Sequence, residues 1–195
     1  MVIKSDLQVS SCWIVTEDLV GLQNQAIGLA QALRLPYILK EIKRPKGLLH
    51  LFSPVERGLI APWPDMLISC GRQSGPVSVA IRRASKNKTF TVHIQDLFID
   101  PKQFDVVIVP THDKMRGKNV FVTQGAIHHV STERLNGASM HFRPLLSSLP
   151  RPLICVLVGG KNKHQGFSDV LAHDFAKKLL ASVAITGGGL AISFS

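Results

Sequence analysis

Short apolar runs that alternate with helix-spaced apolar residues are the feature that most restricts the fold of this chain. The first run covers residues 12–16, and the apolar residues that follow it at helical spacing are Ala26, Leu29, Ala30 and Leu33. Further strands are expected at 37–42, 65–70, 90–95, 104–109 and 119–123. A short helix is expected near residues 55–60 and a longer one at 77–84. Continuous apolar runs separated by helices are typical of parallel strands covered on both faces. The pattern therefore predicts an α/β, Rossmann-like, doubly wound parallel sheet in residues 1–127.

The alternation restarts after a proline-containing stretch, residues 128–152, which we interpret as a linker. The sequence Ser-Thr-Glu-Arg within it is expected to cap a short helix. Residues 153–195 then predict a strand at 153–158, a helix at 170–183 and a strand at 190–194. One β-α-β unit cannot bury both faces of its sheet. We interpret it as the truncated start of a second Rossmann-like domain, and a native compact end is the alternative.

Charge and composition limit the classes of partner. The formal net charge of +10 favours anionic partners, although ordinary solubility charge explains it equally well. The basic residues are spread out and no aromatic stripe alternates with them, so no nucleic-acid partner is expected. No apolar run approaches the roughly 20 residues of a membrane span, and the N-terminus lacks a secretory signal. We therefore expect a cytoplasmic protein, with peripheral contact to the inner face of a membrane as a further option.

The three cysteines point to packing rather than chemistry. Cys12, Cys70 and Cys155 each lie in or beside an apolar run, and no CxxC pair occurs. We predict buried, reduced thiols. The pair His128-His129 is a poor metal site because adjacent side chains of an extended segment point in opposite directions. No metal and no cofactor are predicted.

The candidate binding residues of the first domain follow predicted strands, where ligands bind in open parallel sheets. Asp18, Gly21 and Gln25 follow the first strand and open a helix, which suits either an anion or a simple capped helix start. After the strand at 65–70, Gly71 permits a ligand to approach the backbone closely. The guanidinium group of Arg72 can bind a phosphate or carboxylate through two N–H groups, and the alternative is that Arg72 is an ordinary surface residue.

Two further strand ends carry polar residues. Gln95 and Asp96 together can hold sugar hydroxyls, and Asp96 could equally brace a turn. His112, next to Asp113, is a candidate general base or an ordinary loop residue.

The second unit contributes one candidate phosphate-binding loop. It consists of Gly159, Gly160 and Lys161, which follow a strand. The loop is not a Walker A motif, because GxxxxGK[ST] is absent.

Taken in order, these pieces resemble the mitochondrial fission proteins of the elongated-mitochondria family, including its bacterial members. The resemblance is carried by residues 13–16, 24–30, 64–72, 94–96, 104–113, 120–128 and 156–160. It implies two Rossmann-like domains facing a cleft, similar to B-type glycosyltransferases. The first loop departs from the family pattern, since it lacks the usual glycine-rich stretch with a histidine.

Three functional hypotheses follow. The resemblance implies a glycosyltransferase-like protein that, in its full-length form, binds a nucleotide-sugar or a related anion. The alternatives are a non-catalytic module that recruits a partner or a membrane, through the apolar residues 48–52 beside Lys43, Arg44 and Lys46, or an inactive remnant of a truncated gene. Pairing with a separate C-terminal half is a further expectation, and the sequence leaves open whether the chain is an enzyme.

Overall fold

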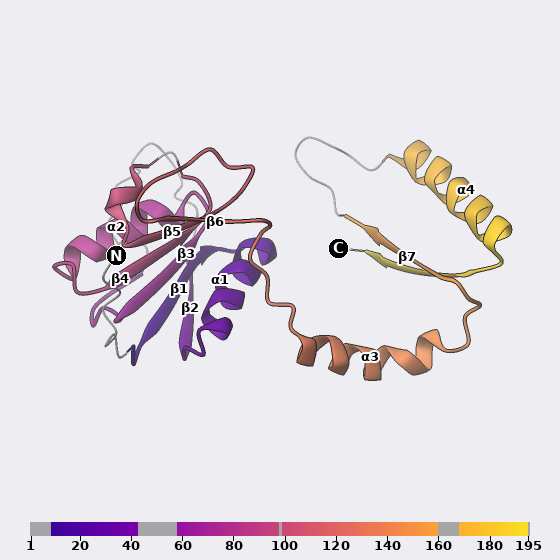
Figure 1. Ribbon diagram of the computed structural model, residues 1–195, viewed down its shortest axis with the longest axis horizontal. Coiled ribbons are helices and arrows are strands. Elements are labelled where there is room, and N and C mark those ends of the chain that lie inside the picture. The colour runs from indigo at the N-terminus through magenta and orange to yellow at the C-terminus, as the bar shows by residue number, and fades with distance from the viewer. Residues whose placement is uncertain (1–8, 43–57, 98, 160–167, 195) are drawn as a thin grey trace. The chain divides into compact units, whose positions relative to one another are not determined.

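The computed structural model describes residues 9–42, 58–97, 99–159 and 168–194. The chain divides into two compact units, Met1–Val130 and Ser131–Ser195. Each unit is described by itself below (Figure 1).

The N-terminal unit is built on six parallel strands in the order β2-β1-β3-β4-β5-β6. Their bounds are β1 (Cys12–Glu17), β2 (Tyr37–Ile42), β3 (Met66–Cys70), β4 (Phe90–Ile94), β5 (Val106–Pro110) and β6 (Val120–Thr123). The predicted parallel α/β sheet is confirmed. The chain moves from β1 outward to β2, returns to β3 and then proceeds in the other direction. The strand order therefore reverses between β1 and β3, which makes their carboxyl ends a topological switch point.

Helices cover both faces of this sheet, as Figure 1 shows for α1 (Val20–Ala32) and α2 (Ser74–Ala84). Alternate residues of a strand point to opposite faces. Ile14 of β1 accordingly packs in one cluster with Ala26 of α1, whereas Val15 packs in another with Val77 of α2. The unit is therefore doubly wound, and the central strands β1 and β3 are buried along their whole length because helices cover both faces.

The segment after β6 returns across α1. Ile127 packs against the cluster on the α1 face of the sheet. A Cβ atom at Gly28 in α1 would overlap the backbone carbonyl of His128. The missing side chain at Gly28 therefore allows this segment to lie directly on the helix.

The C-terminal unit holds one β-α-β element preceded by a helix. Its elements are α3 (Thr132–Leu146), β7 (Leu153–Val158), α4 (Asp169–Thr186) and β8 (Gly189–Phe194), and β7 pairs with β8 in parallel. Ser131 caps α3 by accepting a hydrogen bond from the backbone N–H of Arg134 (3.3 Å), as the sequence predicts, but the helix is 15 residues long rather than short.

Two expectations differ from the structure. Leu59 and Ile60 are not helical, and the rest of the short helix expected near residues 55–60 lies outside the described residues. The prediction of buried thiols holds for Cys12 and Cys70 but is wrong for Cys155, which is exposed. Cys155 lies on a two-stranded sheet whose faces are incompletely covered; the neighbouring Leu157 is 86% exposed.

Candidate functional site

The switch point places acidic and glycine residues beside each other. Glu17 is the last residue of β1, and Asp18, which is exposed, follows it. Cys70 is the last residue of β3 and lies in register with Thr16, so the loop that begins at Gly71 starts next to Glu17. This is the crevice in which open α/β sheets bind their ligands.

The Glu17 carboxylate lies at the N-terminus of α2. Glu17 is only 6% exposed, and its Oε1 accepts a hydrogen bond from the backbone N–H of Gln73 (3.2 Å). Gly71 has φ +100°, and a Cβ there would lie 3.1 Å from Glu17 Oε1 and 2.5 Å from Leu22 Cδ1. A helix N-terminus attracts anions through its free N–H groups and its dipole. Here the Glu17 carboxylate already accepts a hydrogen bond from one of these N–H groups, that of Gln73.

Glu17 is a site residue that the sequence analysis missed. The available signal was an acidic residue at the end of an otherwise apolar run, since carboxylates are rarely buried without a partner. Burial and the charge of Glu17 together raise the pKa of Cys70 to about 12. The Cys70 thiol is therefore protonated at neutral pH, which fits packing rather than nucleophilic chemistry.

Thr16 adds an unsatisfied polar atom to the switch point. It is fully buried, and its Oγ1 has no hydrogen-bond partner among the described residues. A buried hydroxyl without a partner is uncommon and calls for an explanation, such as a water molecule or a ligand.

The ends of β4 and β5 bring the remaining polar candidates together. The backbone N–H of Asp96 donates to Asp113 Oδ2 (3.3 Å), which ties the loop after β4 to the loop after β5. His112 Nε2 lies 3.8 Å from Asp113 Oδ1, and the His112 side chain is 78% exposed. Gln95 has φ +89°, a conformation that L residues rarely adopt. Strain of this kind clusters at functional sites.

The other predicted residues lie outside the loops that follow β4 and β5. Gln25 donates through Nε2 to the carbonyl of Gly21 (3.2 Å), so both belong to the first turns of α1. Arg72 is exposed in the loop before α2. Gly159 ends β7 in the C-terminal unit, and its proposed partners Gly160 and Lys161 lie outside the described residues, as do residues 43–52.

A buried histidine lies within the sheet rather than at its edge. His93 is fully buried on β4, its Nδ1 is 2.8 Å from Ser69 Oγ, and its ring lies 5.2 Å from that of Phe104. Burial lowers the pKa of His93 to about 3, so the imidazole is neutral at physiological pH. The described part of the chain gathers no three His, Cys, Asp or Glu side chains that could hold a metal ion. Nor does any helix in that part have the length and apolarity needed to cross a membrane.

Comparison with known proteins gives one family and two relatives. The family described as Mitochondrial fission ELM1 matches residues 20–195. The mitochondrial fission protein ELM1 of Arabidopsis thaliana is 28% identical over 155 residues, covering 68% of this chain and 36% of the plant protein. The uncharacterized protein RP120 of Rickettsia prowazekii (strain Madrid E) is 23% identical over 211 residues, covering 86% of this chain and 59% of that protein.

The chain thus spans 36% and 59% of the lengths of these two relatives. No solved structure matches it.

Proposed function

This chain belongs to the mitochondrial fission ELM1 family, and from that premise we propose that its N-terminal unit binds the sugar or hydroxyl-rich part of a ligand at the switch point. The relevant form is a longer, two-domain protein of glycosyltransferase-B-like architecture. In that form the ligand is a nucleotide-sugar or a related anion, and its phosphates bind at the second unit.

The observation that carries the proposal is the acidic, hydrogen-bonding character of one sheet edge. Glu17, Asp96 and Asp113 end or follow three strands of one parallel sheet, and parallel strands end at the same edge. Carboxylates repel phosphate but accept hydrogen bonds from hydroxyl groups. The Thr16 hydroxyl at the same edge is fully buried and has no hydrogen-bond partner among the described residues, so it would gain one from a polar group that reaches it. This chemistry favours a sugar over a phosphate at the N-terminal unit.

Within this proposal catalysis is electrostatic. The positive groups of the second unit, with Gly159 and the Lys161 that follows it in sequence, stabilise the leaving diphosphate. His112 beside Asp113 serves as the base that removes the proton of the acceptor hydroxyl.

Calorimetry with uridine and guanosine diphosphates and their sugar conjugates tests the proposal, on this chain and on a full-length relative. We expect the sugar conjugates to bind the full-length protein more tightly than the free diphosphates. Asp96→Asn should remove that preference, whereas Asp100→Asn, in the same loop, should preserve it because asparagine also caps a turn. If the full-length relative binds no nucleoside diphosphate, the proposal fails.

A second candidate function is non-catalytic recruitment of a partner or a membrane, because the name of the plant relative ties that protein to mitochondrial fission. The exposed apolar side chains of the C-terminal unit favour it, since extensive exposed apolar surface marks interaction sites. These side chains include Leu135, Met140, Leu145, Leu157 and Phe194. Sedimentation with liposomes tests the membrane version of this function. Equal pelleting with and without anionic lipid would count against it.

A further inference from the structure

A basic hollow lies at the opposite edge of the N-terminal sheet from the switch point. In a β-α-β connection the helix runs back across the sheet, so the end of α2 lies at the amino edge of the strands. The hollow has a volume of about 200 Å³ between that end and the 3-10 turn η2 (Pro101–Gln103), and its lining residues are Val79, Arg82, Arg83, Asn87, Lys102 and Gln103. The proposed function uses none of them.

One wall of the hollow is fixed by a two-point ion pair. Arg82 donates through Nε and Nη2 to the two carboxylate oxygens of Asp105, at 3.2 and 2.9 Å. Asp105 also accepts from the backbone N–H of Thr91 (2.8 Å) and its hydroxyl (2.9 Å). The Arg82 charge is therefore neutralised and its side chain is held in place, which makes it a rigid wall rather than a free cation.

Among the described residues, no carboxylate neutralises the other cations of the hollow. Arg83 donates through Nη2 to the neutral amide oxygen of Gln103 (3.1 Å), which fixes its direction without cancelling its charge. Within the described part of the chain, neither Arg83 nor Lys102 forms an ion pair with a carboxylate. Asp100, the acid nearest to Lys102 in sequence, caps η2 by accepting a hydrogen bond through Oδ1 from the backbone N–H of Lys102 (3.0 Å).

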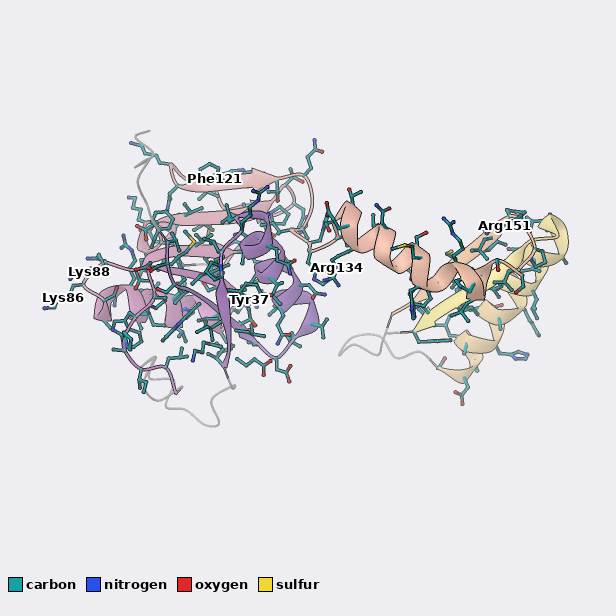
Figure 2. The ribbon with its side chains drawn as sticks, turned by 90° about the horizontal axis from the view of Figure 1, so that it is seen from below. Tyr37, Lys86, Lys88, Phe121, Arg134 and Arg151 are labelled. Atoms are coloured by element: carbon teal, nitrogen blue, oxygen red, sulfur yellow. The ribbon has the colours of Figure 1, made fainter. Side chains whose placement is uncertain are left out.

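The turn after α2 adds a polar side chain, Asn87, to the lining of the hollow. Lys86 and Asn87 have φ +55° and +60°, and their backbone N–H groups bond the carbonyls of Arg83 (2.9 Å) and Arg82 (2.8 Å). This tight turn brings the Asn87 side chain to the hollow, and Figure 2 shows Lys86 and Lys88 close together at the surface of this unit, directed outward.

From this arrangement we propose that the hollow binds a phosphate monoester through Arg83, Lys102 and Asn87. A guanidinium fork and an ammonium group together match the charge and the oxygens of a phosphate. The hollow is smaller than the roughly 300–1,000 Å³ typical of small-molecule sites, so it accommodates the phosphoryl group and not a whole nucleotide. The phosphate source is either a soluble ester or a lipid headgroup.

The competing explanation is that these cations only offset the negative end of the α2 dipole. Basic residues in a last helical turn stabilise a helix in this way. That explanation predicts an effect of substitution on stability but no phosphate binding. Lys102 lies on η2 and not on α2, so the dipole does not account for its position.

The experiment is a titration of the ¹⁵N-labelled chain with glycerol 3-phosphate, followed by NMR at constant ionic strength. We expect shifts confined to residues 82–88 and 101–104. The double variant Arg83→Gln/Lys102→Gln should bind about tenfold more weakly or worse, since each lost charge-assisted hydrogen bond weakens binding. The control Lys114→Gln/Lys118→Gln removes two exposed positive charges from the loop after β5 and should bind as the wild type does. Circular dichroism verifies that all variants fold.

A second arm separates the two sources. Vesicles of phosphatidylcholine with and without phosphatidic acid are sedimented with the same proteins. Pelleting that requires phosphatidic acid, Arg83 and Lys102 assigns the hollow to a lipid headgroup. Binding of glycerol 3-phosphate without pelleting on phosphatidic acid vesicles assigns the hollow to a soluble phosphate ester. The proposal is overturned if neither probe binds, or if the double variant and the control behave alike with both.

Discussion

The pairing of Asp105 with Arg82 shows how one residue links three elements. Its carboxylate joins the end of α2 to β4 and to the start of β5, through Arg82 and Thr91. Burial raises the pKa of Asp105, but hydrogen bonds from Arg82 and Thr91 outweigh it and hold the pKa below the usual range. The ionised form is therefore the one that stabilises the fold.

Asp105→Asn should lower the free energy of unfolding at pH 7 by about 1–3 kcal/mol, because it leaves Arg82 and the Thr91 donors without their charged acceptor. A carboxyl group with a lowered folded pKa contributes stability that is full above its unfolded pKa of about 3.9 and is lost as pH falls through the folded pKa. The difference between wild type and variant should thus shrink below about pH 4. Urea denaturation at several pH values measures it. The exposed Asp18→Asn is the control, and an equal effect there would contradict the assignment.

The thiols allow a second prediction at the residue scale. Burial raises the pKa of Cys12 to about 11, and burial with the Glu17 charge raises that of Cys70 to about 12. Since the thiolate is the reactive form, both should resist iodoacetamide at pH 8 in the native protein, whereas the exposed Cys155 should react. Peptide mass spectrometry after labelling reads each site. Rapid native labelling of Cys70 would show that the switch point opens.

At the scale of elements, the sequence predicts strands better than helix starts. Apolar runs locate the central strands β1 and β3 because both of their faces are buried. The edge strand β2 is located instead by its alternating pattern, and Ile38 on it is 57% exposed. The helical spacing of apolar residues becomes visible only from Ala26 onward, whereas α1 spans Val20–Ala32. Its N-cap residue, Leu19, makes no side-chain cap that a sequence could reveal. α2 begins at Ser74 rather than 77, with Pro76 in its first turn, a position that proline tolerates.

The candidate site can be predicted only in part from the sequence, because some of its contacts depend on which strands are neighbours. Strand ends identify Gln95, Asp96 and His112 because a parallel sheet brings such ends to one edge. The contact between Glu17 and the start of α2 depends on β1 and β3 being neighbours, which joins residues 56 positions apart. Strand order is a tertiary property, and no local pattern specifies it.

Two glycines of α1 give a matched test of this packing. Gly21 has no atom within 4 Å of its Cβ position, whereas a Cβ at Gly28 would meet the backbone of His128. Gly21→Ala should therefore stabilise the fold by up to about 1 kcal/mol through helix propensity. Gly28→Ala should instead destabilise it by about 1–3 kcal/mol, because backbone must move. Thermal denaturation compares the two, and equal effects would show that the 127–129 segment does not lie on α1.

At the scale of the whole molecule, the two units differ in how well they bury their apolar side chains. Within the described part of the chain, the three clusters of buried apolar residues all lie in the N-terminal unit. In the described part of the C-terminal unit, only Gly188 and Gly189 are buried. Stability should accordingly reside in the first unit, since burial of apolar surface is the main driving force of folding.

This difference predicts how the units behave when separated. A fragment of residues 1–130 should unfold cooperatively, with a midpoint close to that of the main transition of the whole chain, because it keeps the six-stranded sheet and both covering helices. A fragment of residues 131–195 should retain helical circular dichroism but bind the dye ANS and show poor amide dispersion, since a two-stranded sheet is marginally stable alone. Leu157→Ser should then reduce ANS binding by the whole chain, while the same change at buried Leu67 should unfold the first unit. A C-terminal fragment with well-dispersed amides and no ANS binding would mean that its apolar side chains find partners within the unit. The recruitment function would lose its support, and the sugar-binding edge would stand as the sole candidate.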